Sequence, residues 1–450
     1  MIGLTACVTV GPDYQAPAPA LPAHWHAAHP TDAQSIRAWW QQFSDPKLDA
    51  LVDSALTASP DLRSAQSKLR EARARTGLSE AARGPNIGNT LTARRSETAG
   101  AGQVSDSYSA GFDASWEIDL FGGTRRSIEA AQATEQAAEA SLRDAQVSLA
   151  AEVARNYLDL RTQQTRLEIA RSNLASQEET SRIARWRQQA GLVTELDAVQ
   201  AASTLETSRA RIPALESAVE TALNKLAVLA GLSRQAIGER LAKPEAQPAT
   251  PPALGLRIPA ETLIQRADVR AAERKLAAAT ANIGVATAER YPALKLSGNI
   301  GLSALSPGTL LLSDAASNSL LASLTTPIFD NGRIRRNIEI QNALQEQALI
   351  SYEKAVAQAL ADVETALVAL AKSRERVTSL RLAAESARLA ASLAQHRYSS
   401  GLIDFGSLQD TQRSQLSAED TLASALGEEA SALVQLYKAL GGGFGETQAP

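Results

Sequence analysis

The strongest constraint on this chain is an internal duplication, because its second half repeats the pattern of its first. Matching segments keep a separation of 207 to 210 residues along the whole chain. Repeats of this kind decide the architecture first, since each copy is expected to adopt the same local structure. The matched segments are SPDLRSA at 59–65 with RADVRAA at 266–272, Pro85 with Pro292, FGGTRR at 121–126 with DNGRIRR at 330–336, and AGLVTEL at 190–196 with SGLIDFG at 400–406.

Each half predicts the same order of elements: a helix, two strands, a very long helix, a short turn and a second long helix. The first repeat covers 47–236, with strands at about 86–98 and 108–120 and long helices at 124–189 and 194–231. The second covers 260–440, with strands at about 293–304 and 318–329 and long helices at 333–398 and 404–440. A Pro- and Ala-rich extended arm (1–46) precedes them, a Pro-rich equatorial linker (237–259) joins them, and a tail (441–450) follows.

The second predicted strand shows the clearest periodicity in the chain. From Tyr108 to Leu120 every even position is apolar, whereas the odd positions through Asp119 are small or polar. A period of two indicates a β-strand with one apolar face and one polar face. All four predicted strands are near or above the ~9–11 residues with which a tilted strand crosses a bilayer.

The helices predicted at 124–189 and 333–398 are much longer than those of a globular domain, since each would extend about 100 Å. Apolar residues at heptad spacing supply a seam along them, which predicts helical partners over the whole length. Pro213 is expected to kink or break the returning helix of the first half. The heptad row is Val153, Leu160 and Leu167 in the first half and Val363, Leu370 and Val377 in the second.

The composition excludes several classes of protein. The 450 residues carry a net charge of −4, so the basic footprint of a nucleic-acid-binding protein is missing. No apolar run approaches the ~20 residues of a membrane-spanning helix, which excludes a helical membrane protein. A β-barrel stays open because its signal per strand is much weaker. No nucleophile elbow, phosphate loop or zinc signature occurs, so we do not expect an enzyme.

The single cysteine, Cys7, ends the segment LTAC, which matches the lipobox at which bacterial lipoproteins are cleaved and acylated. A chance cysteine near a terminus is the alternative interpretation. The charged and apolar regions of a signal peptide do not precede Cys7, so we expect that the sequence begins late. Apart from a covalent lipid on Cys7, no cofactor is predicted.

Three of the four histidines, His24, His26 and His29, cluster in the arm. Neighbouring imidazoles can hold a transition metal, which would suit a metal sensor or a metal pump. Because no carboxylate or cysteine supports them nearby, we favour an arm that wraps the outside of the protein, is anchored by Trp25 and holds no metal.

Four two-faced strands are too few to close a barrel. In lipid an open sheet edge leaves N–H and C=O groups unpaired, and each unpaired group costs several kcal/mol. The sequence therefore predicts that copies of the chain share one barrel. Two copies give eight strands and three give twelve, and only the larger barrel leaves a pore, since side chains fill the smaller one.

The segment GPDYQAP after the lipobox, the tandem halves, the AGL and SGL turns and LQDTQRSQL at 408–416 resemble the TolC-like outer membrane factors of tripartite efflux pumps, in particular their lipoprotein branch. The resemblance implies a mixed α and β fold. It also implies a homotrimer in which a 12-stranded β-barrel in the outer membrane continues into a 12-helix periplasmic α-barrel.

The resemblance also assigns roles to residues at the turns between the long helices. It places the turns at the periplasmic tip, where an adaptor protein docks, although a glycine there is also an ordinary helix end. Beyond the second turn, Asp410 and Arg413 would close the mouth of the duct, although an ordinary surface pair is the alternative. Gly406 stands where relatives often carry a leucine, so Phe405 or Leu408 is expected to replace that plug. The predicted docking residues are Gly191, Leu192, Val193, Thr194, Gly401, Leu402, Ile403 and Asp404.

The same resemblance turns one face of the strands to lipid. Tyr108 or Trp116 would lie at an interfacial girdle, while Asp113, Glu117 and Asp119 would face water in the pore. The predicted lipid-facing residues are Phe112, Trp116, Ile118, Leu296, Ile300 and Leu302.

Together with this resemblance, the sequence predicts a passive, gated exit duct for drugs or other small toxic compounds, anchored by lipid in a Gram-negative outer membrane and extending into the periplasm. Its expected partners are two further copies, a periplasmic adaptor and an inner-membrane pump of the resistance-nodulation-division (RND) type. Two alternatives remain open: a type I secretion duct, and a soluble periplasmic coiled-coil scaffold.

Overall fold

The computed structural model describes residues 9–18, 38–98, 103–251 and 260–443. Over these residues the chain consists of long helices and one four-stranded sheet. Cys7, His24, His26 and His29 lie outside the described residues, so acylation and metal binding stay predictions. None of the helices in the described ranges combines the length and the apolar character needed to cross a bilayer.

The chain divides into two compact units. The strand unit comprises Met1–Pro19, Ser67–Ala140 and Arg270–Ala355, and the tip unit comprises Ala20–Gln66, Ser141–Val269 and Val356–Pro450. Each unit takes matching pieces of both predicted repeats, so the compact units cut across the repeats. The division falls within the two longest helices, α3 (Gly123–Gln189) and α7 (Arg333–Ser399), which have 67 residues each.

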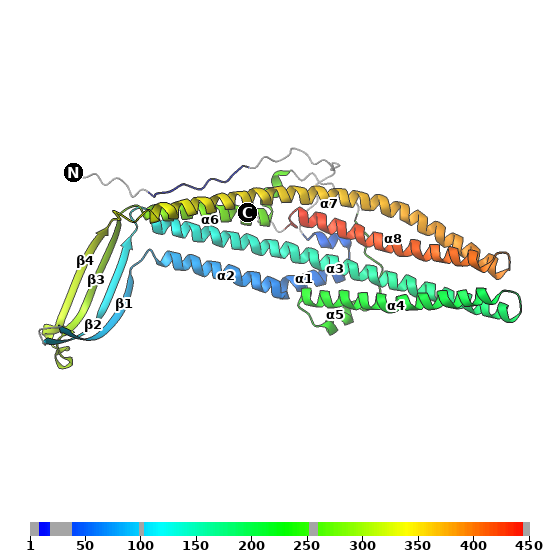
Figure 1. The fold of residues 1–450 in the computed structure, drawn as a ribbon, viewed down its shortest axis with the longest axis horizontal. Coiled ribbons are helices and arrows are strands. Elements are labelled where there is room, and N and C mark those ends of the chain that lie inside the picture. The colour runs from blue at the N-terminus through cyan, green and yellow to red at the C-terminus, as the bar shows by residue number, and fades with distance from the viewer. Residues whose placement is uncertain (1–8, 19–37, 99–102, 252–259, 444–450) are drawn as a thin grey trace. The chain divides into compact units, whose positions relative to one another are not determined.

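The strand unit contains the sheet, whose order β1-β2-β3-β4 follows the sequence and whose neighbours are all antiparallel (Figure 1). Its central pair, β2 with β3, joins the two predicted repeats into one sheet. The strands are β1 (Asn86–Thr98), β2 (Gln103–Ile118), β3 (Ala293–Ala304) and β4 (Ala316–Thr325).

Two strand boundaries differ from the predicted ones by more than two residues. β2 begins at Gln103 rather than at 108, because its backbone goes on pairing with β1 beyond the apolar alternation. β4 ends at Thr325 rather than at 329. Pro327 explains the early end, since it has no N–H with which to continue the ladder. The pattern of side chains therefore misplaces a strand end where backbone hydrogen bonding sets that end.

Residues 9–18 of the strand unit are held against its helices. Arg126 of α3 donates from Nη2 to Asp13 Oδ1 at 2.7 Å and from Nε to the Val10 carbonyl at 3.1 Å. The Tyr14 hydroxyl donates to the Glu273 carboxylate. This unit also contains most of α2 (Pro60–Ala81) and α6 (Ala267–Ala288).

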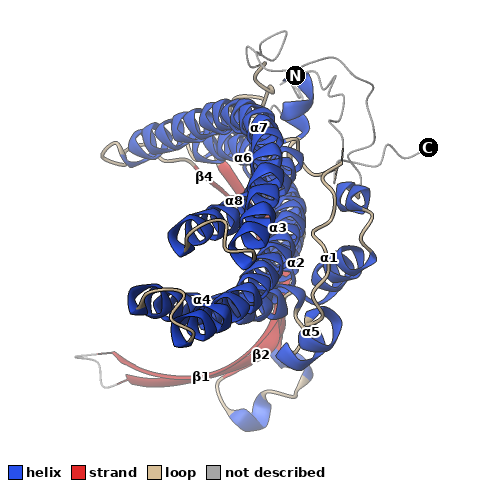
Figure 2. Cartoon of the chain, turned by 90° about the vertical axis from the view of Figure 1, so that its right-hand side faces the viewer, coloured by secondary structure: helices blue, strands red, loops and turns tan. Residues whose placement is uncertain are grey.

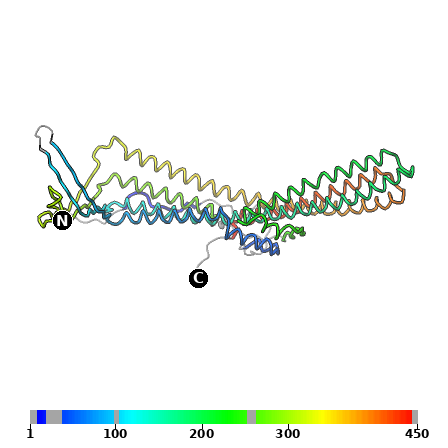
Figure 3. Tube along the Cα trace, turned by 90° about the horizontal axis from the view of Figure 1, so that it is seen from below, coloured from blue at the N-terminus to red at the C-terminus, as the bar shows by residue number. Residues whose placement is uncertain are grey.

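The tip unit contains two helical hairpins, α3 with α4 and α7 with α8, whose connecting turns lie at the same end of this unit (Figures 2 and 3). The heptad residues of both helices are buried, which confirms the predicted seam. The helices confined to this unit are α1 (Pro46–Ala58), α4 (Glu195–Ala230), α5 (Arg234–Leu241) and α8 (Phe405–Ala439), with a short 3₁₀ turn at Trp39–Phe43.

The break that was one alternative at Pro213 does not occur, and one predicted boundary is wrong. α4 continues through Pro213 without a break. Proline removes one helical hydrogen bond, but Pro213 and Arg209 are both exposed, so water can satisfy the freed carbonyl of Arg209. The predicted linker start at 237 falls inside α5, where the Ser233 side chain caps the helix by accepting from the Ala236 N–H at 3.2 Å.

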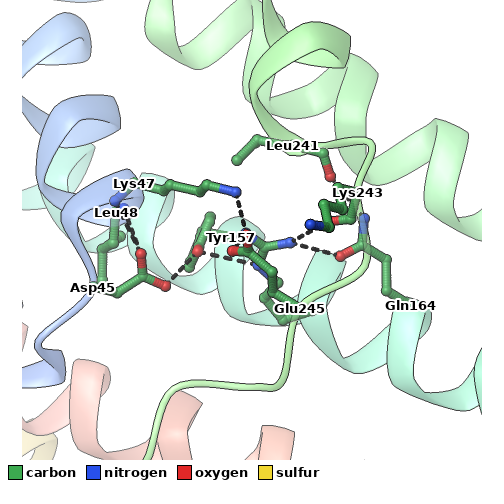
Figure 4. Close-up of polar contacts among 9 residues, drawn as sticks. Asp45, Lys47, Leu48, Tyr157, Gln164, Leu241, Lys243 and Glu245 are labelled. Atoms are coloured by element: carbon green, nitrogen blue, oxygen red, sulfur yellow. Dashed lines mark hydrogen bonds and ion pairs between the residues drawn. The ribbon is translucent and has the colours of Figure 1, made fainter.

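A buried arginine ties the linker of the tip unit to α3. The Arg161 side chain is 0% exposed and donates to Glu245 Oε2 at 2.9 Å and to the Lys243 carbonyl at 3.2 Å (Figure 4). Nearby, Gln164 Nε2 donates to the Leu241 carbonyl at 2.8 Å. α3 thus binds the segment that follows α5 through both of these side chains.

The same cluster reaches the start of α1. Tyr157 donates to Asp45, the residue that caps α1 by accepting from the Lys47 N–H at 2.9 Å. Burial and the bond to Asp45 raise the pKa of the Tyr157 hydroxyl. The hydrogen bond from Lys47 lowers the pKa of the Glu245 carboxyl below 4.5, so this carboxylate is charged at neutral pH. Arg161 is therefore buried with a compensating charge.

Replacing Arg161 by Met is expected to destabilise the protein by about 1–3 kcal/mol, because the buried oxygens of Tyr157 and Gln164 and the Lys243 carbonyl lose their donor. Chemical denaturation of the detergent-solubilised protein, followed by circular dichroism, measures the change. Arg155→Met on the exposed side of the same helix is the matched control, expected to stay within about 0.5 kcal/mol of wild type. Equal losses in the two variants would contradict the role of the cluster.

Candidate functional site

The apolar residues predicted to face lipid lie on one face of the sheet. In the antiparallel register Phe112 is opposite Ile300 and Trp116 is opposite Leu296, and directly opposed residues share a face. Phe112 is 61% exposed and Ile300 66% exposed, so this face is uncovered within the chain. The structure thus gives the protein a broad apolar surface of the kind that marks an interaction site.

The ends of this face carry aromatic and polar groups. Trp116 Nε1 donates to the Arg83 carbonyl at 2.8 Å, at one end of β2. Tyr108 lies near the other end, and beyond it an ion pair joins Arg95 to Asp106 at 3.6 Å. The strand rise places Tyr108 and Trp116 about 27 Å apart. A strand tilt of ~40° reduces that spacing to about 21 Å across the bilayer, somewhat less than the ~25 Å apolar band that aromatic residues flank in outer-membrane strands.

The opposite face of the sheet is small and polar except for Leu321, which lies opposite Ser297. The Thr90 hydroxyl donates to Asp113 across β1 and β2. Ser319 Oγ donates to Asn299 Oδ1 at 3.2 Å across β3 and β4, and Glu117 lies opposite Lys295. The sheet thus separates an apolar surface from a polar one.

The two turns of the tip unit have the same backbone structure. Gly191 and Gly401 each have φ of +73°, the left-handed conformation that ends many helices. The Leu192 N–H donates to the Arg187 carbonyl, and the Leu402 N–H to the Arg397 carbonyl, both at 2.8 Å. Leu192 and Leu402 are each 73% exposed. The turns therefore present one leucine each to solvent.

The other predicted docking residues build the turns. Thr194 caps α4 in a capping box with Asp197, and Asp404 caps α8 by accepting from the Ser407 N–H at 2.8 Å. This backbone hydrogen bond lowers the pKa of the Asp404 carboxyl. Val193 is half-buried, and Ile403 packs on a buried cluster. An open groove of about 1000 Å³ is lined by residues of both turns.

Arg187, which sequence reasoning missed, joins the two hairpins at their turns. Its Nη2 donates to the carbonyls of Tyr398 at 2.8 Å and Ser399 at 3.0 Å. Its guanidinium lies over the Tyr398 ring, 4.6 Å from the centroid. The only signal in the sequence is a basic residue in the last turn of a helix, a place where such side chains bind helix carbonyls.

The residues predicted to form a gate separate into two groups. The side chains of Asp410 and Arg413 are exposed and have no hydrogen-bond or ion-pair partner in the described part of the chain. Gly406 is exposed as well. Phe405 and Leu408, by contrast, are buried with Tyr398. Both side chains pack inside the chain, which does not favour the prediction that either replaces the missing leucine plug.

An exposed apolar sheet face on one unit and paired helical turns on the other define an outer-membrane channel protein. A family model for "Outer membrane efflux protein" matches residues 51–232 and 258–442. The pyoverdine export outer membrane protein OpmQ of Pseudomonas aeruginosa is 33% identical, over 98% of this chain and 96% of that protein.

Two solved structures are similar over nearly all of the chain. The outer-membrane channel OprN matches with a TM-score of 0.90 and 38% identity, over 97% of this chain and 99% of that one. The open state of the Neisseria gonorrhoeae MtrE outer membrane channel matches with a TM-score of 0.83 and 30% identity, over 97% of this chain and 99% of that one. The chain therefore belongs to the outer membrane efflux protein family, and it is the outer membrane channel component of an efflux system.

The two sheet faces predict opposite responses to a charge. Arg at Phe112 or Ile300 is expected to cost about 2–4 kcal/mol at mid-bilayer and to reduce assembly, whereas Arg at Trp116 or Leu296, at the end of the apolar face, is expected to cost only about 0–1 kcal/mol. The matched controls, Ser115→Arg and Ser297→Arg on the polar face, should assemble normally. The assay is the amount of folded, heat-modifiable protein in outer membranes. Equal tolerance of Arg on both faces would contradict the assignment.

Proposed function

We propose that three copies of this chain form one closed, gated exit duct across the outer membrane and the periplasm. The observation that carries the proposal is a sheet with a mostly apolar face, interrupted by Asn89 and Asn318, and with two outer edges, on β1 and β4, that pair with no other described strand. In lipid these edges must find partners. Three copies supply twelve strands and twelve long helices, which leave a pore where two copies would not.

The turns of the tip unit are the proposed docking site for a periplasmic adaptor protein. Leu192 and Leu402 support this, because each exposes an apolar side chain at an otherwise ordered helix end. The groove lined by both turns adds room for a partner's helical hairpin. Through the adaptor the duct would serve an inner-membrane pump of the RND type, which supplies the energy.

The cargo we propose is a small compound, such as a drug, a solvent or a secreted metabolite. OpmQ, whose name assigns it to pyoverdine export, supports a small-molecule cargo for this chain. A wide water-filled conduit adds little selectivity of its own, so the pump would choose the substrate. The alternative to small-molecule export is type I protein secretion, for which the same fold could also form the exit duct.

Asp410 and Arg413 form the proposed gate. Both are exposed and unpartnered in the described chain, so they are free to pair between copies. Three copies would place six such charges around one axis, where unpaired aspartates would repel one another. Because Gly406 offers no side chain, closure would depend more on these charges than in a duct with a leucine there.

Replacing both Asp410 and Arg413 by Ala is expected to raise single-channel conductance in planar bilayers and to let large antibiotics enter cells. High salt should reproduce part of this effect in the wild type, because salt screens exposed pairs. The matched control replaces two other exposed charged residues of α7, Arg381 and Glu385, by Ala and should leave conductance unchanged. Unchanged conductance in the Asp410 and Arg413 variant would move the gate elsewhere.

Cys7 is the proposed lipid anchor, and its position after Leu4-Thr5-Ala6 supports this. Cys7→Ser, expressed behind a functional signal peptide, should lose labelling by a radioactive or alkyne fatty acid. The variant should still assemble, because the strands hold it in the membrane. Labelling that persists in Cys7→Ser would contradict the anchor.

A further inference from the structure

The two longest helices of the chain, α3 and α7, end in the same way, so their corresponding residues can be compared one by one. α3 and α7 have equal lengths. A shift of 210 in residue number matches their last residues, Gln189 with Ser399, and the glycines of the turns that follow, Gly191 with Gly401. By the same shift Arg187 corresponds to Arg397. Each arginine lies in the last turn of its helix.

Arg187 already has a defined task within the chain. It donates to the carbonyls of Tyr398 and Ser399 at the end of α7. The last carbonyls of a helix lack helical partners and carry the negative end of the helix dipole. A guanidinium is therefore well suited to this position, and Arg187 fastens the first hairpin to the second.

Arg397 has no such task within the chain. Its side chain is exposed and makes no contact with a hydrogen-bond or ion-pair partner in the described ranges. The carbonyls that correspond to those of Tyr398 and Ser399 belong to Gln188 and Gln189. No described side chain donates to them, and both residues are exposed. In the described chain, Arg397 and the end of α3 are therefore unused counterparts of Arg187 and the end of α7, which already bind each other.

We propose that Arg397 of one copy binds the carbonyls of Gln188 and Gln189 in the next copy. The inference rests on the proposed closed ring of copies, in which the second hairpin of one chain neighbours the first hairpin of the next. A head-to-tail contact of this kind closes a ring when each copy repeats it. We call each contact between an arginine and a helix end a clasp. Clasps made by Arg187 within a copy would then alternate around the ring with clasps made by Arg397 between copies.

The two kinds of clasp differ in one respect. Arg187 lies over the aromatic ring of Tyr398, whereas the corresponding residue on α3 is Gln188, which has no ring. A cation–π contact adds to the attraction of an arginine. The clasp between copies lacks it and is the weaker of the two, so the tips separate first along the boundaries between copies.

Co-expression of two differently tagged copies tests the contact. One copy carries Arg397→Cys and the other Gln189→Cys, and a bis-maleimide with a spacer about as long as an arginine side chain is added to outer membranes. A cross-linked pair of chains carrying both tags is expected. The matched control exchanges Arg397→Cys for Arg381→Cys, further back on α7, and should give no such pair. Cys7 is present in every sample.

The outcomes separate this inference from the proposed function. Trimers that form but give no more of the doubly tagged pair than the Arg381→Cys control overturn the clasp and leave the duct standing. Absence of trimers in the unmodified protein overturns both. As a second measurement, Arg397→Ala should increase channel opening while Arg397→Lys retains part of the closure. An Arg397→Ala channel that opens like wild type would also overturn the inference.

Discussion

The unpaired outer edges of the four-stranded sheet are the constraint on which the remaining structure depends. Among the described residues, β1 is paired only with β2, and β4 only with β3. Water could satisfy such edges, but a lipid environment cannot, and the apolar face of Phe112 and Ile300 requires lipid or a comparable cover. Neighbouring copies can supply strand partners for both edges and leave the apolar face on the outside.

The duplicated helices suit the same arrangement of copies. Because its two hairpins have the same turns, each chain contributes two nearly equivalent segments to a ring, and contacts within a copy have counterparts between copies. The proposed gate requires that the two hairpins differ in some residues. Tyr398 beneath Arg187 has Gln188 as its counterpart, and Asp410 and Arg413 have Gln200 and Ser203. The second hairpin therefore carries the charges proposed to close the mouth.

Periodic signals in the sequence were sufficient for much of this fold. Alternation from Tyr108 onwards identified a strand, and the heptad row through Leu160 identified a buried seam, because both depend on which side of an element is covered. The turn glycines were equally clear, since the left-handed conformation at Gly191 and Gly401 favours glycine. These signals are local, and each can be read from one segment alone.

Features that depend on distant segments could not be predicted in this way. Arg161 looks like any helix-surface arginine until Glu245, 84 residues away in the sequence, is placed beside it. Phe405 and Leu408 were expected at the gate because they flank Gly406, yet packing against Tyr398 turns them inward. Pro213 is expected to interrupt a helix by local rules, yet α4 continues through it, with the freed carbonyl of Arg209 accessible to water.

The number of copies in the assembled protein is the most direct measure of whether the sheet edges are closed in this way. Native mass spectrometry of protein released gently from the outer membrane into detergent gives that number without labels. Closure of twelve strands predicts a particle of three chains that falls to single chains on heating. A particle of one or two chains from native membranes would contradict a shared pore.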